Sequence, residues 1–234
     1  MTTEFAIQIG QLEFGWKPDQ TLLDIDRFEL AAGESVFLVG PSGSGKSSLL
    51  AVIAGIAPAS AGEIAILGQD MTALSPARRD AFRADNLGVI FQLFNLVPYL
   101  SPLDNVMLPC RFSKARRDRA TRNGSLRSEA ERLLNSLGLD AATISRASTE
   151  LSVGQQQRVA AARALIGAPG LIIADEPTSA LDSSSRDNFI ELLQGECEAA
   201  NSALLFVSHD EALGRFFDRH VDLVDINRAG SVVA

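Results

Sequence analysis

The feature that most constrains the fold is a glycine-rich loop set between an apolar run and a helix-like stretch. Residues 40–47 read GPSGSGKS, a complete match to the pattern GxxxxGK[ST]. An apolar run at residues 36–39 precedes the loop, and residues 47–56 have a helix-like composition. Glycines let backbone N–H groups turn inward, and the following helix adds the positive end of its dipole. The pattern therefore predicts a strand, a phosphate-binding loop and a helix in succession, with Lys46 as a point charge on the phosphates.

A second block, residues 171–177, is an apolar strand that ends in two adjacent carboxylates. Such a pair suits a magnesium partner, Asp175, followed by a water-activating base, Glu176. The alternative for residues 40–47 is a glycine- and serine-rich turn without a ligand, which the strand before it and the helix after it disfavour. Together the two blocks predict that the chain binds and hydrolyses a nucleoside triphosphate.

Composition restricts the partners and the location of the protein. The chain has 234 residues, enough for one substantial core, and its net charge of −8 argues against a surface dedicated to DNA or RNA. Cys110 and Cys197 lie far apart without metal-binding spacing, which predicts reduced thiols in a cytosolic protein. No uninterrupted apolar stretch approaches about 18 residues, and residues 1–4 lack the basic character of a signal peptide. We therefore expect any membrane role to come through a partner.

The predicted elements are those of an α/β protein. Residues 5–39 alternate loosely between turn clusters and predict short strands. Apolar runs predict further strands at residues 63–67, 87–91, 171–175, 203–207 and 221–226. Because the later strands alternate with helices and are almost continuously apolar, we expect a parallel sheet that is covered on both faces.

Strand signals vanish between residues 95 and 148, which predicts a helical insertion. Ser101-Pro102 marks one helix start in this region, and residues 125–137 have helical spacing before Gly138. We expect a single domain spanning residues 1–234. Its nucleotide-binding core with a β-subdomain comprises residues 1–92 and 150–234, and its helical subdomain comprises residues 93–149.

A further motif lies just before the strand that carries Asp175. Residues 151–158 read LSVGQQQR and closely resemble the LSGGQ signature of ATP-binding-cassette (ABC) ATPases. Other motifs of this family are matched, in the right order, by Trp16, Gln92, residues 179–182 (SALD) and His209. The resemblance covers nearly the whole chain. It implies an ATPase that uses ATP and Mg2+, with the P-loop NTPase fold: a RecA-like core with a parallel sheet, an antiparallel β-subdomain and an inserted helical subdomain.

The resemblance also assigns roles within the nucleotide site. Ser47, Asp175 and Gln92 would bind magnesium, Glu176 would be the general base, and His209 would contact the γ-phosphate and fix the geometry of the water and the base. Gln92 therefore counts among the catalytic residues as well. The nucleotide itself would be held by Trp16, Gly40, Pro41, Ser42, Gly43, Ser44, Gly45, Lys46, Ser47 and Ser48. Trp16 stands where the family stacks an aromatic ring on adenine, and Phe14 is a competing candidate.

The signature segment implies a dimer. Ser152 is a natural N-cap, so a helix is expected to begin there with free N–H groups that point outward. In ABC ATPases this helix end faces the γ-phosphate bound by a second subunit, in a homo- or heterodimer. The residues implied at the partner's nucleotide are Ser152, Val153, Gly154, Gln155 and Asp182. Val153 departs from the family's glycine, but the first helical position has a negative φ and tolerates a β-carbon, so we expect activity to be retained.

Residues 93–100 (LFNLVPYL) are conspicuously apolar for a loop region, which suggests a protein partner. In ABC transporters this region receives a short cytoplasmic helix of the membrane subunit. The resemblance therefore implies a membrane permease partner that contacts the region after Gln92, and a peripheral location on the cytoplasmic face of the inner membrane. The alternative is that these side chains pack the helical subdomain.

Residues 88–92 and 105–109 are similar to one branch of the family. It comprises the ATPase subunits of lipoprotein-releasing and macrolide-exporter systems and the cell-division ATPase, which implies an exporter or a mechanotransmission-type system. The ATPase of an amino-acid importer and a soluble ABC ATPase without a membrane partner are the alternatives. Residues 111–127 hold seven basic residues and one acid. A solvated helix surface is the favoured interpretation, and contact with anionic lipid or an acidic partner is the other.

Overall fold

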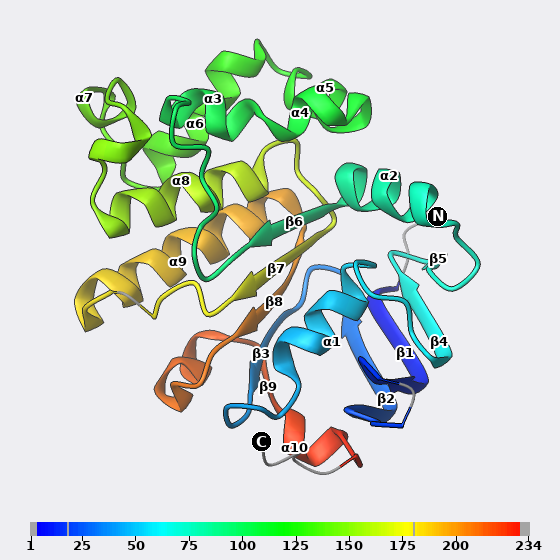
Figure 1. Cartoon of the computed structure of the whole chain (residues 1–234). Helices are drawn as coiled ribbons and strands as arrows, with labels where there is room; N and C mark the ends of the chain where they lie inside the picture. Colours follow the sequence, from blue (N-terminus) through cyan, green and yellow to red (C-terminus); the bar gives the residue numbers. More distant parts are fainter. Residues whose placement is uncertain (1–3, 18, 180, 230–234) are drawn as a thin grey trace.

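The molecule contains two β-sheets of different type, a parallel sheet through its middle and an antiparallel sheet at the lower right of Figure 1, and a group of helices lies above the parallel sheet. The structure is a computed structural model that describes residues 4–17, 19–179 and 181–229. Of the N-terminal residues considered for a signal peptide, residues 1–3 lie outside the described part. No helix in the described part is long and apolar enough to cross a membrane.

The first sheet is antiparallel and has the strand order β2-β1-β4-β5. Its strands are β1 (Phe5–Phe14), β2 (Leu23–Ala31), β4 (Ala61–Ile66) and β5 (Gln69–Asp70). β1 is longer than the short strands expected, because it pairs with β2 on one side and β4 on the other. Its inward side chains, among them Ile7 and Leu12, are fully buried, so burial of one face fixes the register of the strand. Trp16 lies two residues beyond the buried Phe14, which is the last residue of β1.

The second sheet is parallel and has the order β6-β7-β8-β3-β9. Its strands are β3 (Ser35–Val39), β6 (Leu87–Ile90), β7 (Leu171–Asp175), β8 (Ala203–Val207) and β9 (Arg219–Asp222). The predicted parallel sheet is therefore confirmed, and the expected bounds of β7 and β8 match. The almost fully apolar sequences of these strands fit their position, because both faces of the sheet are covered by other elements.

The prediction of a strand over residues 221–226 is wrong after Asp222. β9 ends at Asp222, and the chain then forms the short helix α10 (Leu223–Ile226). The Asp222 side chain accepts a hydrogen bond from Val224 N at 2.9 Å, which caps the helix. Asn227 then fixes the end of α10 by accepting from Asp24 N at 2.8 Å. Local apolar composition does not distinguish these six residues from a strand, and the cap and the distant contact decide the outcome.

Helices surround the parallel sheet and fill the region where the insertion was expected. α1 (Lys46–Ile53), α2 (Pro76–Asn86), α8 (Val153–Leu165) and α9 (Ser183–Ala200) follow or precede its strands. Between β6 and α8 the described chain forms α3 (Pro102–Met107), α4 (Pro109–Phe112), α5 (Lys114–Ala120), α6 (Leu126–Ser136), α7 (Ala141–Ile144) and the 3₁₀ turn η1 (Ser148–Glu150). A second 3₁₀ segment, η2 (Glu211–Phe216), follows β8. α3 and α6 begin where helices were expected, and Ser101 and Ser125 cap them through their side chains.

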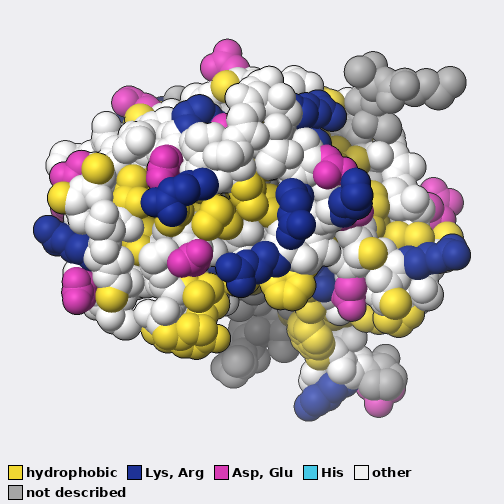
Figure 2. All heavy atoms as spheres, turned by 90° about the horizontal axis from the view of Figure 1, so that it is seen from above, with side chains coloured by type: hydrophobic (Ala, Val, Ile, Leu, Met, Phe, Trp, Pro, Cys, Tyr) yellow, Lys and Arg dark blue, Asp and Glu magenta, His cyan; other side chains and the backbone are white. Residues whose placement is uncertain are grey.

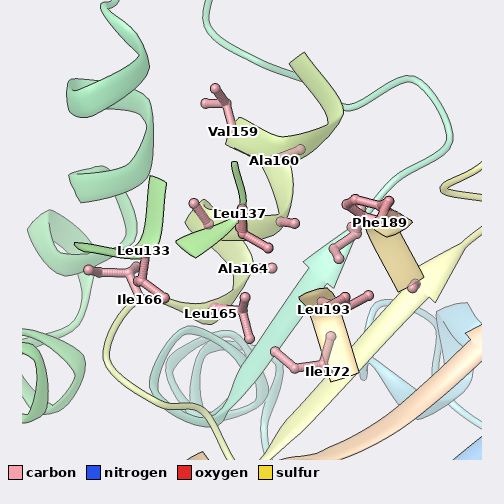
Figure 3. Close-up of a cluster of buried hydrophobic side chains, with 14 of the residues drawn as sticks. Leu133, Leu137, Val159, Ala160, Ala164, Leu165, Ile166, Ile172, Phe189 and Leu193 are labelled. Atoms are coloured by element: carbon pink, nitrogen blue, oxygen red, sulfur yellow. The ribbon is translucent and has the colours of Figure 1, made fainter. Parts of the chain in front are cut away.

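One buried cluster joins the inserted helices to the parallel sheet. In Figure 3, Leu133 of α6 and Leu137, which follows the last residue of that helix, lie beside Ala164 and Leu165 of α8, and Ile172 of β7 lies beyond them. Phe189 and Leu193 of α9 belong to the same cluster. Because α8 packs on both sides, it connects the inserted helices to the sheet. The division of the chain into a nucleotide-binding core and a helical subdomain remains a prediction.

The basic segment at residues 111–127 has a structural use that the sequence did not reveal. Arg116 is buried, and its guanidinium donates to the carbonyls of Ile166 at 2.9 Å and Leu87 at 3.1 Å. It also donates to Ala164 O at 2.5 Å, close to the end of α8. Burial lowers the pKa of Arg116 to about 10, and the nearby positive charge of Arg119 also lowers it. Arg116 therefore stabilises the end of α8, and the segment is not simply a solvated surface.

Candidate active site

Four functional segments meet at one edge of the parallel sheet. The phosphate-binding loop follows β3, Gln92 follows β6, Asp175 ends β7 and His209 follows β8. Since these strands are parallel, their carboxyl ends lie at the same edge, where ligands of open α/β sheets bind. A cavity of about 430 Å³ lies there. Its lining residues are Leu22, Ser42, Gly43, Gly45, Lys46, Ser47, Ser48, Gln92, Asp175, Glu176 and His209.

The phosphate-binding loop has the backbone that its glycines predict. Gly43 has φ 80° and Gly45 has φ 103°, in the left-handed region that favours glycine. α1 begins immediately afterwards at Lys46, without a side-chain cap on its first turn. Its N-terminal N–H groups are thus available to an anion. The Lys46 ammonium group donates to the carbonyls of Gly40 at 2.6 Å and Pro41 at 3.0 Å, and so lies across the loop.

Two further loop residues complete this turn. Ser44 is buried, and a β-carbon on Gly40 would come within 2.8 Å of the Ser44 hydroxyl oxygen. Glycine at position 40 therefore allows the loop to close on itself. Ser42, Ser47 and Ser48 line the cavity, whereas Gly40, Pro41 and Ser44 are not among its described lining residues.

The carboxylates at the end of β7 lie in different environments. Partial burial raises the pKa of Asp175, and the adjacent Glu176 raises it further, while Lys46 and the Ser47 hydroxyl lower it. A cation placed beside such a carboxylate would stabilise its charged form. Glu176 has φ 47°, a left-handed conformation that is uncommon for a residue other than glycine. Its backbone N–H donates to Val207 O at 2.9 Å, which holds this turn against the end of β8.

His209 contacts Glu176 directly. Its Nδ1 lies 2.8 Å from Glu176 Oε2. The His209 side chain is 67% exposed and that of Glu176 is 14% exposed, so the histidine is open to solvent while the carboxylate is mostly covered. The contact brings a carboxylate and an imidazole ring together beside the phosphate-binding loop. His220, by contrast, packs its ring on Phe37 at a centroid distance of 5.3 Å, away from this site.

Trp16 lies beside the phosphate-binding loop. Its Nε1 donates to Ser48 Oγ at 3.0 Å, and its side chain is 65% exposed. Phe14, the competing candidate for adenine stacking, is buried and packs nearly perpendicular to the Trp16 ring at a centroid distance of 5.0 Å. An exposed ring face is required for stacking on a base. The geometry therefore favours Trp16 over Phe14.

The signature residues lie in another part of the molecule. Ser152 caps α8 in a reciprocal capping box, in which Gln155 Oε1 accepts from Ser152 N at 2.9 Å. Val153 is the first residue of α8 and is exposed. A β-carbon on Gly154 would lie 3.3 Å from Leu181 Cδ2, so the signature helix packs near the start of α9. In Figure 1 this end of α8 lies beside the start of α9, away from α1.

Asp182 lies near the signature segment and not in the cavity. It is the N-cap of α9, and its carboxylate accepts from Ser185 N at 3.0 Å and from the Ser185 hydroxyl at 2.8 Å. These hydrogen bonds lower the pKa of Asp182 to about 2. Residue 180, in the matched SALD motif, lies outside the described residues. Among the described residues, those that line the cavity include neither Ser152 nor Asp182.

Leu22 lines the cavity but belongs to no motif that the sequence analysis identified. It precedes β2, and its backbone N–H donates to Phe14 O at 2.8 Å. The turn that contains Trp16 is thus closed by Leu22, which brings both residues to the phosphate-binding loop. A single leucine at a strand start carries no sequence signal for this role.

The fold and this site together define a P-loop nucleoside triphosphatase. A phosphate-binding loop, a carboxylate pair and a histidine lie at the carboxyl edge of a parallel sheet. A family model described as "ABC transporter" matches residues 23–179, and the chain therefore belongs to the ABC transporter family. It is an ATP-binding and ATP-hydrolysing subunit of that family. The predicted family and ATPase activity are thus confirmed.

Similar proteins agree with this assignment. The lipoprotein-releasing system ATP-binding protein LolD 2 of Rhodospirillum rubrum is 43% identical over 199 residues, which cover 85% of this chain and 83% of that protein. The uncharacterized ABC transporter ATP-binding protein YbbA of Escherichia coli is 40% identical over 193 residues, 82% of each chain. These relatives confirm the resemblance to the lipoprotein-releasing branch.

Solved structures show the same fold. The cassette MJ0796 in a dimeric post-hydrolysis state, bound to ADP and Pi, superimposes with a TM-score of 0.79 at 31% identity. That comparison covers 92% of this chain and 93% of the other. A second dimeric structure of the same cassette also gives a TM-score of 0.79, at 32% identity, and covers 93% of this chain and 94% of that one.

Proposed function

We propose that two copies of this chain, or this chain and a related one, bind two ATP molecules between them and thereby drive a membrane permease. The observation that carries the proposal is the separation of two exposed features in one chain. The cavity contains the phosphate-binding loop and Glu176, whereas the capped start of α8 at Ser152 lies elsewhere. A second subunit can place its own α8 across the cavity. The dimeric structures of a similar cassette support this arrangement.

Several residues in and beside the cavity have a proposed part in ATP binding or hydrolysis. The N–H groups of the phosphate-binding loop and Lys46 would hold the β- and γ-phosphates. Glu176 would accept the proton of the attacking water, and His209 would orient Glu176 through the contact at 2.8 Å while facing the γ-phosphate. Trp16, just beyond the end of β1, would stack on the adenine ring. The N–H groups at Ser152 of the second subunit would then complete the γ-phosphate site.

The donor set of the cavity suits magnesium. Ser47, Gln92 and Asp175 offer a hydroxyl, an amide and a carboxylate oxygen, and all three line the same cavity. Mg²⁺ prefers such oxygen ligands and is commonly held by one or two carboxylates together with substrate phosphates. We propose that these three residues hold the ion, which would neutralise charge on the phosphates. The raised pKa of Asp175 fits this assignment, because a cation restores the charged carboxylate.

The permease would contact the region after Gln92. In this region Leu93 is 83% exposed and Tyr99 is 86% exposed, whereas Phe94 is buried at 8% exposure. Some of these apolar side chains therefore pack the inserted helices, and others face solvent, where a protein partner can cover them. Figure 2, which looks down on the top of Figure 1, shows hydrophobic side chains exposed among Lys and Arg side chains on that face.

The relatives suggest which permease this is. Several carry the name of a lipoprotein-releasing system, so we propose an export or force-transmitting system of that type, with this chain on the cytoplasmic face of the membrane. The alternatives within the family are the ATPase of an amino-acid importer and a soluble ABC ATPase without a membrane partner. The apolar exposure of Leu93 and Tyr99 argues against the soluble form.

Co-purification from detergent-solubilised membranes tests the permease contact. The tagged chain is expected to retain a permease, and Tyr99→Glu is expected to lose it, because a charge would be buried at the contact. Val224→Glu provides the control, since Val224 is an exposed apolar residue on α10, far along the chain from this region. ATP binding by both variants establishes that they are folded. Equal retention by Tyr99→Glu and Val224→Glu would contradict the proposed contact.

A further inference from the structure

Two ion pairs connect α9 to the segment that follows β8. Arg186, in the first turn of α9, donates from Nη1 to Asp210 Oδ2. Arg215 of η2 donates to Asp187 Oδ2 at 2.6 Å, one residue further along α9. The Arg186 side chain is largely buried, whereas that of Arg215 is mostly exposed. Solvent and salt therefore weaken the second pair more than the first.

Arg186 lies between two segments of the proposed site. Its backbone N–H donates to Asp182 O at 2.9 Å, and the Asp182 side chain caps the same helical turn. Its guanidinium holds Asp210, the residue that follows His209. One side chain thus joins the turn that carries Asp182 to the turn that carries His209.

Hydrogen bonds made by Asp210 hold the turn around His209. Asp210 N donates to Ser208 Oγ at 3.2 Å, and Asp210 Oδ1 accepts from Ala212 N at 3.1 Å. The second oxygen of the Asp210 carboxylate is the one that Arg186 holds. Because the His209 ring is mostly exposed, its orientation toward Glu176 relies on the backbone of this turn. A charge-assisted hydrogen bond from a guanidinium is short and directional, which suits it to fixing such a turn.

We propose that Arg186 is a positioning residue: through Asp210 it fixes His209 beside Glu176, and it couples that placement to the Asp182 segment at the subunit interface. This inference rests on the proposed function, in which His209 and Glu176 act in hydrolysis and Asp182 faces a second subunit. Engagement of the second subunit would move or stiffen the start of α9. The Arg186–Asp210 pair would carry that change directly to the histidine.

Arg186→Met tests the inference, because it keeps an aliphatic side chain of similar length and removes the guanidinium. We expect kcat for ATP to fall on the order of 10-fold, since small misplacements of a reacting group are costly. The KM and the calorimetric Kd for ATP are expected to stay unchanged, because Arg186 does not line the cavity. Arg215→Met is the matched control, and its kcat is expected to equal that of the wild type.

Three further variants separate positioning from general damage to the fold. Arg186→Lys keeps the charge and is expected to recover part of the lost kcat. Asp210→Asn keeps an acceptor for Ala212 N and is expected to lower kcat as Arg186→Met does. In a His209→Ala background, Arg186→Met is expected to have no additional effect, because the two residues then act through one interaction.

The outcomes distinguish this inference from the proposed function. Wild-type kcat in both Arg186→Met and Asp210→Asn would overturn the inference, as would fully additive losses with His209→Ala. A loss equal to that of the Arg215→Met control would also overturn it, since α9 packing would then be the cause. Undiminished hydrolysis in Glu176→Gln would instead contradict the proposed function. If Arg186→Met does not melt cooperatively and is thus misfolded, the kcat of Asp210→Asn tests the inference in its place.

Discussion

The Nδ1 atom of His209 lies 2.8 Å from Oε2 of Glu176, although the two residues are 33 positions apart in the chain. They follow neighbouring strands, β8 and β7, whose parallel pairing ends with Asp175 opposite Val207. The Glu176 backbone N–H then donates to Val207 O, so the same two strand ends hold both the backbone and the side chain of this pair. We therefore expect the carboxylate and the histidine to act as one unit in hydrolysis.

Glu176→Gln is expected to abolish steady-state ATP hydrolysis while ATP binding is retained. The amide has the shape of the carboxylate but cannot accept the proton of the attacking water, and loss of a general base costs about 10²–10⁴-fold. Phosphate release measures the turnover, and calorimetry measures the affinity. Turnover at the wild-type rate would mean that another residue is the base.

Lys46→Ala is expected to weaken ATP binding as well as turnover. The Lys46 ammonium group lies across the phosphate-binding loop, and its charge offsets phosphate charge before and during the reaction. Calorimetric titration with ATP under hydrolysis-free conditions gives the dissociation constant. An unchanged constant would show that the loop does not hold the phosphates through this residue.

Dimerisation is expected to require MgATP and the start of α8. Sedimentation of Glu176→Gln should show a monomer without nucleotide and a dimer with MgATP, because two helix N-termini repel each other until an anion lies between them. Adding Ser152→Arg should prevent the dimer without loss of ATP binding. The control is Ser128→Arg, an exposed serine near the start of α6. A dimer that forms without nucleotide, or that tolerates Ser152→Arg, would contradict this arrangement.

Arg116→Met is expected to destabilise the fold by about 2–4 kcal/mol, because it leaves several buried carbonyls without their charged donor. Arg111→Met, at an exposed arginine of α4, should change the free energy of unfolding by no more than about 0.5 kcal/mol. Urea denaturation followed by circular dichroism compares the two. Equal stability of both variants would show that water satisfies the carbonyls around position 116.

Local sequence patterns were sufficient for much of the fold. The bounds of β7 and β8, the helical spacing of α6 and the loop before α1 all follow from neighbours within a few residues. The candidate site residues were also named from motifs, and Trp16, Lys46 and Glu176 do lie around one loop and its cavity. Their roles remain predictions that the variants above test.

The sequence by itself determined which short segments form strands, helix starts and a phosphate-binding loop, because those choices depend on backbone preference and on the period of apolar residues. The helix after Asp222, where a strand was expected, depends on the contact of Asn227 with Asp24 as well as on its local cap. Tertiary structure alone decided the strand order that places His209 beside Glu176. It also decided the partners of Arg116 and Arg186. These outcomes depend on contacts between residues far apart in the chain, whose energies arise only when the elements pack.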